Sequence, residues 1–234
     1  MRYAAVFFDA GETLVHPHPS FPDLLSEILN REGFNVSPDR VRERAHVVFD
    51  RFRSAAQANE LWTTSPERSR KFWHEVYAIF FRELEIPKAN GLIDVVYGEF
   101  TDLANYRLFD DVPDVLERLR DAGLVLGVIS NFEEWLERLL EQLGVHGLFD
   151  VRVISGVEGV EKPDPRIFEL ATTRAGVAPE RSVYVGDNPE FDVGPALAVG
   201  MVPVLIDRRG RFEQEERATR ITRLDQLPGV LGIA

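Results

Sequence analysis

Hydrophobic residues follow two different periods along the chain, and the change of period divides the sequence. Residues 2–8 are mostly apolar, β-branched and aromatic, which is typical of a buried strand. Between residues 20 and 102, apolar side chains instead recur at helical spacing. Ser-Pro pairs at 37–38 and 65–66 combine an N-cap residue with a first-turn proline, which indicates helix starts. This block is therefore predicted to be all-helical.

The second half of the chain alternates between strand-like and helix-like segments. Strands are predicted at 124–130, 151–155, 182–185 and 202–206, and helices at 113–121, 133–143, 165–175 and 191–199. Such alternation predicts a parallel sheet with helices on both faces. The helical block separates the strand at residues 2–8 from its expected partners, so it is predicted to be an insertion after the first strand.

We therefore predict an α/β fold, in which a Rossmann-like parallel sheet with helices on both faces carries an inserted all-helical cap domain. Residues 1–15 and 104–234 would form the catalytic core, and residues 16–103 the cap. A group of aromatic residues in the block is predicted to form the core of the cap rather than a substrate pocket. These are Phe72, Trp73, Tyr77, Phe80 and Phe81.

Composition and charge narrow the possible functions. The chain has no cysteine, which excludes disulfides and thiolate metal sites. No apolar run approaches the ~18 residues that a membrane span needs, so we expect a cytoplasmic protein that binds no membrane. A net charge of −12 disfavours nucleic acid, although local donors could still bind a small anion. Residues 208–211 form a basic turn followed at once by glutamates, which indicates a solvated mixed-charge surface.

Polar residues stand just beyond the ends of the predicted strands. In an open parallel sheet, ligands bind at the carboxyl ends of the strands, so these side chains should converge at one edge. They are Asp9, Ser130, Asn131, Lys162, Asp187 and Asp192. Carboxylates suit a hard divalent cation, whereas an ammonium, a hydroxyl and backbone N–H groups suit a phosphoryl group. The sequence therefore predicts a site that holds a cation and a phosphate together.

Four segments resemble, in order, the four motifs of the haloacid-dehalogenase-like hydrolases. They are Phe7-Phe8-Asp9-Ala10-Gly11-Glu12-Thr13-Leu14, Val128-Ile129-Ser130-Asn131, Glu161-Lys162-Pro163-Asp164-Pro165 and Val185-Gly186-Asp187-Asn188-Pro189-Glu190-Phe191-Asp192. The helical block lies where that family inserts a cap between its first and second motifs. The Asp-Ala-Gly-x-Thr form of the first motif resembles a subgroup of the family.

The resemblance implies a role for each matching position. Asp9 would attack phosphorus and form an aspartyl-phosphate, and Mg²⁺ would be held by Asp9, the Gly11 carbonyl and Asp187. Ser130, the backbone of Asn131 and Lys162 would bind the phosphoryl oxygens. Lys162 would also keep Asp9 ionised through its positive charge. Asp192 would orient Lys162 or a water on the metal, and Thr13 would support the site from the surrounding shell.

The first motif departs from the phosphatase pattern at Gly11. Phosphatases of the family usually carry an aspartate there, which protonates the leaving oxygen and later activates water. Such acid–base help is typically worth ~10²–10⁴ in rate, so activity without it should be slow. Glu12, His16 and His18 are candidate substitutes. Neighbouring residues on an extended chain point to opposite sides, which argues against Glu12.

Three functions stay open, and the leading one is a Mg²⁺-dependent phosphatase acting on a small phosphorylated metabolite, as a monomer or homodimer. The second is a 2-haloacid dehalogenase, since these enzymes also lack an aspartate at the position of Gly11. However, haloacid dehalogenases have no aspartate at the position of Asp187, whereas this chain has one. Without a cation between them, the carboxylates of Asp187 and Asp9 would repel each other. The third is a catalytically weak or inactive protein that binds phosphate or a partner on the same fold.

Overall fold

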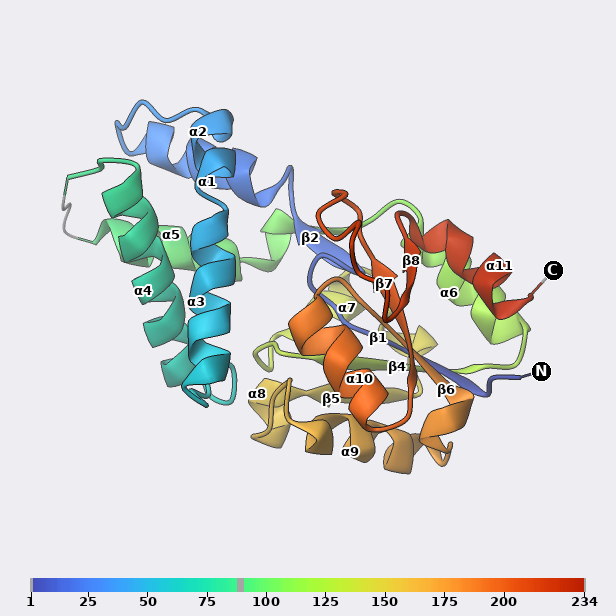
Figure 1. Cartoon of the computed structure of the whole chain (residues 1–234). Helices are drawn as coiled ribbons and strands as arrows, with labels where there is room; N and C mark the ends of the chain where they lie inside the picture. The colour runs from blue at the N-terminus through green and yellow to red at the C-terminus, as the bar shows by residue number, and fades with distance from the viewer. Residues whose placement is uncertain (1, 88–90, 234) are drawn as a thin grey trace. The chain divides into compact units, whose positions relative to one another are not determined.

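The structure is a computed structural model that describes residues 2–87 and 91–233. The chain divides into two compact units, one formed by Met1–Val15 with Leu108–Ala234 and the other by His16–Arg107 (Figure 1). That the first unit is the catalytic core and the second its cap stays a prediction. No helix among the described residues is long and apolar enough to span a membrane.

The first unit contains a six-stranded parallel sheet with the order β5-β4-β1-β6-β7-β8. Its strands are β1 (Ala5–Phe8), β4 (Val125–Ser130), β5 (Val151–Ile154), β6 (Ser182–Gly186), β7 (Val202–Ile206) and β8 (Thr219–Ile221). The chain's first strand, β1, lies between β4 and β6, and its four residues are all buried. The predicted parallel sheet is confirmed, although β8 escaped prediction because its three residues are too few to show a period.

Helices cover both faces of this sheet (Figure 1). They are α6 (Val112–Asp121), α7 (Leu136–Gln142), α8 (Ser155–Glu158), α9 (Pro165–Ala175), α10 (Gly194–Ala198) and α11 (Leu227–Leu231). This unit also contains the short helical turns η2 (His146–Leu148), η3 (Pro179–Arg181), η4 (Pro189–Val193) and η5 (Leu224–Gln226). Helices α9 and α10 pack on the face of the sheet that carries the side chains of Phe7 and Tyr184, whereas α6 packs with α11. The predicted α/β architecture with an inserted helical part is therefore confirmed.

The segment after β4 differs from the prediction. A helix was predicted over residues 133–143, but α7 begins only at Leu136. The hydroxyl of Ser155 accepts a hydrogen bond from the Phe132 N–H at 3.0 Å and donates one to the Phe132 carbonyl at 3.1 Å. Because both backbone groups of Phe132 are occupied in this way, the chain leaves β4 as a loop before it turns helical.

The second unit is helical, as predicted, and its described residues form five helices. They are α1 (Phe21–Arg31), α2 (Pro38–Glu43), α3 (His46–Gln57), α4 (Pro66–Glu83) and α5 (Leu92–Thr101), followed by the turn η1 (Leu103–Asn105). The hydroxyls of Ser37 and Ser65 cap α2 and α4 as predicted. A short two-stranded sheet pairs β2 (Val15–Pro17) with β3 (Tyr106–Leu108).

Aromatic side chains build the interior of the helical unit. Phe72 stacks on Phe52 with ring centres 5.5 Å apart, and Tyr77 stacks on Phe100 at 5.8 Å. Phe72, Tyr77, Phe80 and Phe81 are buried, and Trp73 is half-buried. These residues therefore contribute to the core of this unit, as the helical spacing predicted.

Candidate active site

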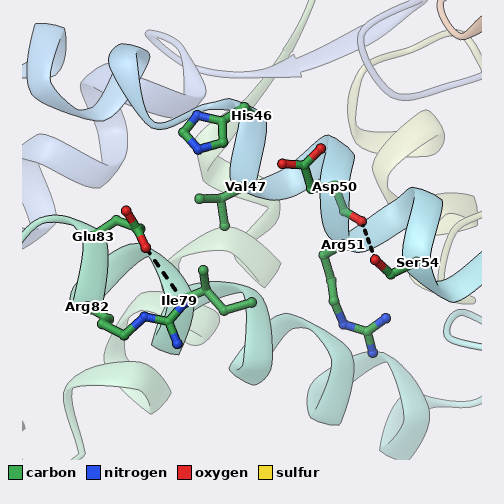
Figure 2. Close-up of a pocket in the computed structure, with 8 residues that line it drawn as sticks. All are labelled: His46, Val47, Asp50, Arg51, Ser54, Ile79, Arg82 and Glu83. Atoms are coloured by element: carbon green, nitrogen blue, oxygen red, sulfur yellow. Dashed lines mark hydrogen bonds and ion pairs between the residues drawn. The ribbon is translucent and has the colours of Figure 1, made fainter.

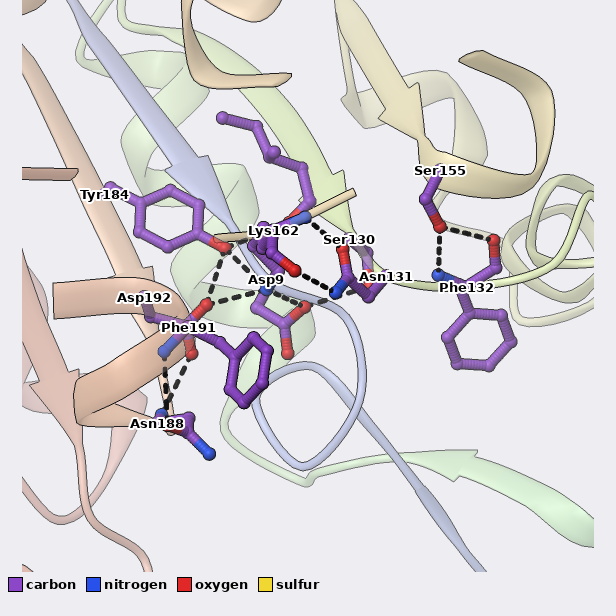
Figure 3. Close-up of polar contacts among 11 residues, drawn as sticks. Asp9, Ser130, Asn131, Phe132, Ser155, Lys162, Tyr184, Asn188, Phe191 and Asp192 are labelled. Atoms are coloured by element: carbon purple, nitrogen blue, oxygen red, sulfur yellow. Dashed lines mark hydrogen bonds and ion pairs between the residues drawn. The ribbon is translucent and has the colours of Figure 1, made fainter. Parts of the chain in front are cut away.

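Asp9 lies immediately after the central strand β1, with its backbone N–H bonded to the Val185 carbonyl on β6 at 2.8 Å. Its side chain is 9% exposed. The Oδ1 atom accepts a hydrogen bond from the Ser130 hydroxyl at 2.9 Å and one from Lys162 Nζ at 2.8 Å (Figure 3). The structure therefore brings together three of the predicted site residues, which lie far apart in the sequence.

The Lys162 ammonium is the centre of this cluster. It is 3% exposed and also donates to Asp192 Oδ1 at 2.6 Å and to the Tyr184 hydroxyl at 3.0 Å. Burial alone would lower the pKa of Lys162, but the Asp192 and Asp9 carboxylates outweigh burial and raise it. Lys162 therefore stays protonated throughout the physiological range.

Asn131 fixes the backbone of Lys162. Its side-chain carbonyl accepts from the Lys162 N–H at 2.7 Å, and its side-chain amide donates to the Lys162 carbonyl at 2.8 Å. Both ends of the Asn131 side chain are therefore used to join the end of β4 to the lysine loop. This agrees with a role in which only the backbone of Asn131 would face a phosphoryl group.

Asp187 and Asp192 follow β6, and a glycine between strand and loop makes room for them. A Cβ atom on Gly186 would lie 2.3 Å from Asp192 Cγ, so no side chain fits there. Asp192 Oδ2 accepts from the Asn188 N–H at 2.9 Å, while its Oδ1 faces Lys162. Asp192 therefore has both oxygens engaged, and Asp187 is the more available carboxylate for a further cation.

The three carboxylates share a small volume. Asp9, Asp187 and Asp192 each offer an oxygen within 4.8 Å of the others. Burial raises the pKa of Asp187 well above its usual range, and Asp192, Asp9 and Glu12 raise it further, against a lowering by Arg211. Burial likewise raises the pKa of Asp9, and Lys162 offsets this only in part. A divalent cation would relieve this repulsion, so the donor set fits a hard metal ion.

The loop after Asp9 differs from the extended chain that was assumed for Glu12. Glu12 has a φ of 57°, so side chains do not alternate there, and its carboxylate pairs with Arg209 Nη2 at 2.6 Å. The argument against Glu12 from alternation is therefore wrong. At Gly11, no described atom outside its two chain neighbours lies within 4 Å of the position that a Cβ would take.

Thr13 is fully buried, and its hydroxyl has no hydrogen-bond partner in the part of the chain that the structure describes. Its carbonyl accepts from Arg208 Nη2 at 3.0 Å, so its link to the site runs through the loop backbone. His16 and His18 belong to the helical unit, where His16 Nδ1 lies 2.7 Å from the Pro17 carbonyl oxygen. Their part in proton transfer stays a prediction.

A turn after β7, here called the arginine turn (residues 207–212), contains the basic turn predicted at residues 208–211, but sequence reasoning missed its acidic partners. The buried Asp207 carboxylate accepts from the backbone N–H groups of Arg211 and Phe212 at 2.8 and 2.9 Å, and Gly210 supplies a φ of 65°. The turn is thus built around a buried acid, while Arg209, Gly210 and Arg211 are exposed, as expected for a solvated mixed-charge surface.

Each arginine of this turn has a carboxylate partner. Arg208 donates to both oxygens of Asp111 at 2.9 Å, and its guanidinium lies 3.8 Å from the centre of the Phe109 ring. Arg209 pairs with Glu12, as described above. The third, Arg211, places Nη2 3.5 Å from Asp187 Oδ2. The turn therefore delivers positive charge to the acidic edge of the site.

The helical unit has a hollow of its own, between α3 and α4 (Figure 2). Its volume is about 280 Å³. The lining residues are His46, Val47, Asp50, Arg51, Ser54, Ile79, Arg82 and Glu83. None of the predicted site residues is among them.

The chain belongs to the haloacid dehalogenase-like hydrolase family, whose sequence pattern matches residues 3–200. It is 41% identical over 133 residues to a glyceraldehyde 3-phosphate phosphatase of Methanopyrus kandleri, an alignment that covers 56% of this chain and 55% of that protein. It is also 39% identical to a phosphoserine phosphatase of Thermus thermophilus, over 90% of this chain and 91% of the relative.

Solved structures share the fold. The magnesium-bound HAD-hydrolase YfnB of Bacillus subtilis superimposes with a TM-score of 0.77 at 16% identity, covering 100% of both chains. Haloacid dehalogenases have this fold as well, so the fold alone does not separate the two chemistries. The chain spans about half the length of several of the curated relatives that it matches.

We expect Asp111→Asn to lower the free energy of unfolding at pH 7 by about 3 kcal/mol, because the largely buried Arg208 guanidinium loses its carboxylate. Burial would raise the pKa of Asp111, but hydrogen bonds from Arg208 and the Leu224 N–H outweigh it and lower the pKa. The stabilisation is therefore present above the ordinary pKa of about 4, and it is lost as the pH falls through the lowered value.

Urea unfolding of both proteins between pH 7 and pH 3 measures this effect. Asp225→Asn is the matched control, because it breaks the exposed Arg223–Asp225 pair and should change stability by less than about 1 kcal/mol. Equal losses in the two variants would contradict the assignment of Asp111 as the anchor of the arginine turn.

Proposed function

We propose that this protein is a Mg²⁺-dependent phosphatase that acts on small phosphorylated metabolites, with Asp9 as the nucleophile. The observation that carries the proposal is the Asp9 carboxylate itself. Its Oδ1 is held by Ser130 and Lys162, while Oδ2 accepts no hydrogen bond from the described residues. A buried, oriented carboxylate with one uncommitted oxygen, beside a second acid at Asp187, suits attack on a phosphoryl group that a cation holds in place.

The relatives support the substrate class. Two proteins to which the chain aligns carry the names glyceraldehyde 3-phosphate phosphatase and phosphoserine phosphatase. Both names describe the hydrolysis of phosphate esters of three-carbon compounds. We therefore place the substrate of this chain among small phosphorylated metabolites.

The residues fit a divalent cation. Asp9 and Asp187 would hold it together with the Gly11 carbonyl, while Asp192 remains bonded to Lys162 and the Asn188 N–H. Oxygen ligands of this kind, with few from the protein, are what Mg²⁺ accepts. When bound, the cation neutralises charge on the phosphoryl oxygens.

The reaction follows from the positions of the side chains. An Asp9 oxygen attacks phosphorus, and the ester oxygen leaves with the bonding electron pair. Ser130, Lys162 and the Asn131 backbone N–H hold the phosphoryl oxygens, and Lys162 compensates the charge of Asp9. Water then hydrolyses the aspartyl-phosphate, which gives inorganic phosphate and restores Asp9. Gly11 supplies no proton at either step, so the reaction is slow unless the leaving group is good.

Asp187 distinguishes this proposal from dehalogenation. Attack on carbon needs no cation, and a carboxylate whose pKa is already raised would then only repel Asp9. The third candidate is a binding protein without turnover, which differs from the proposed phosphatase only in rate. An assay of phosphate release separates these two candidates.

The first prediction from this proposal is that the protein releases phosphate from members of a panel of phosphorylated metabolites in the presence of Mg²⁺. Asp9→Asn should lower that release by about a thousandfold or more, because an amide is a far weaker nucleophile. Asp114→Asn, an exposed aspartate on α6, is the control and should leave the rate unchanged. Phosphate release that survives in Asp9→Asn would refute the nucleophile, and metal-free chloride release from 2-chloropropionate would establish the dehalogenase instead.

A second prediction concerns the empty space at Gly11. Gly11→Asp should raise turnover by about tenfold or more, because a positioned acid–base group is worth ~10²–10⁴ in rate. Apart from its two chain neighbours, no described atom lies within 4 Å of the new Cβ, so the side chain should fit without displacing the loop. Gly11→Asn has the same shape but no titratable proton, and it should give no gain. Equal rates in the two variants would show that proton transfer does not limit turnover.

A third prediction uses two variants of opposite effect on Mg²⁺ affinity, measured by calorimetry without substrate. Asp187→Asn should weaken binding by about tenfold to a hundredfold, because a charged ligand is lost. Arg211→Gln should tighten it by up to about fivefold, because the guanidinium next to Asp187 no longer competes with the cation. Arg217→Gln, which breaks an exposed pair with Glu215, is the control. Unchanged affinity in Asp187→Asn would remove that residue from the metal site.

A further inference from the structure

We infer that Tyr184 is a positioning residue, whose hydroxyl holds the Lys162 ammonium in the orientation in which it meets Asp9. Tyr184 lies on β6, two residues before Gly186, and its side chain is fully buried. Its hydroxyl points into the polar cluster at the end of the sheet, next to Lys162 and Asp192 (Figure 3). Sequence reasoning missed it because an aromatic residue within a buried strand is ordinarily read as core.

The Tyr184 hydroxyl has three polar neighbours, each at 3.0 Å. They are Lys162 Nζ, Asp192 Oδ1 and the carbonyl oxygen of Ile129 on β4. A phenol has one proton to donate and lone pairs to accept with. It can therefore accept from the ammonium while its proton goes to Asp192 or to the Ile129 carbonyl. The hydroxyl links the lysine to two elements that are fixed in the sheet.

The hydrogen bond to Tyr184 matters because the Lys162 ammonium has only a few N–H donors. An ammonium has three N–H bonds and no acceptor. Lys162 Nζ has three partners, namely Asp9 Oδ1 at 2.8 Å, Asp192 Oδ1 at 2.6 Å and the Tyr184 hydroxyl at 3.0 Å. All three donors are thus assigned while no substrate is bound, and the one that points to Asp9 is the one that would turn to a phosphoryl oxygen when Asp9 attacks. If the third partner were removed, the ammonium would keep its charge but could turn about its Cε–Nζ bond.

The ring alone would satisfy the packing. Tyr184 meets Phe168 edge to face with ring centres 5.0 Å apart, and a phenylalanine would keep that contact. A hydroxyl buried in this place needs hydrogen-bond partners to offset its loss of water. Its presence is therefore explained by the polar cluster around Lys162 and not by the apolar core.

Tyr184→Phe tests the inference by NMR of the lysine ammonium groups. The chain has three lysines, Lys71, Lys88 and Lys162, so ¹⁵Nζ labelling gives a spectrum that Lys162→Arg can assign. We expect the Lys162 signal to shift in Tyr184→Phe and its protons to exchange with water about tenfold faster, since one of three hydrogen bonds is lost. Tyr77→Phe, which removes a phenol from another buried ring, should leave that signal unchanged.

A second readout rests on the proposed phosphatase activity. Tyr184→Phe should lower kcat by about tenfold with KM unchanged, because a misdirected ammonium weakens the transition state more than substrate binding. Tyr77→Phe should change neither constant. A wild-type protein without turnover would refute the proposed function but leave the NMR result to decide the role of Tyr184.

An unshifted Lys162 signal with unchanged proton exchange in Tyr184→Phe would overturn the inference. If that variant fails to fold, nuclear Overhauser contacts in the wild-type protein decide instead. We expect contacts between the Lys162 ammonium protons and the Tyr184 ring protons next to the hydroxyl. Their absence from a well-resolved Lys162 signal would equally overturn the inference.

Discussion

The buried ion pairs of Lys162 with Asp9 and Asp192 are the interaction on which the rest of the site depends. Removing such charges from water is unfavourable by several kcal/mol per ion, so the arrangement is stable only if its geometry is held closely. Three features of the fold provide that geometry. The parallel sheet brings the strand ends to one edge, Asn131 fixes the lysine backbone, and the missing side chain at Gly186 lets Asp192 approach.

The same site has more negative charge than its lysine can balance. Asp187 lies among carboxylates, and its nearest positive partner among the described residues is Arg211 at 3.5 Å, too far for a well-formed hydrogen bond. A divalent cation between Asp9 and Asp187 would turn this excess into a binding site for a phosphate dianion. The arginine turn adds positive charge at this edge of a chain whose net charge is −12, and it offsets only part of the local excess of carboxylates.

The sequence allowed the sheet and its polar edge to be predicted because their signals are local. A continuous apolar run predicts β1, and topology then places Asp9, Ser130, Lys162 and Asp187 together. Other parts depend on tertiary contacts that no local pattern reveals. Arg209 and Arg211 are defined by partners about two hundred and about twenty-five residues away in sequence, at Glu12 and Asp187. The sequence pattern indicates only that Tyr184 is a core residue, and its hydrogen bond with Lys162 is visible only in the structure.

The loop after Asp9 lacks the acid–base side chain that the resemblance to the family's phosphatases would predict at Gly11. The residues proposed to bind and orient a phosphoryl group are present, whereas the position that resembles the family's acid–base residue is Gly11, with open space around it. The nearest carboxylate in sequence, Glu12, adopts a left-handed backbone conformation and is tied to Arg209. The ion pair with Arg209 would have to break before the Glu12 carboxyl group could reach a leaving group. In the proposed reaction, the step that lacks help is therefore departure of the leaving group, and substrates with good leaving groups should be favoured over simple alkyl phosphates.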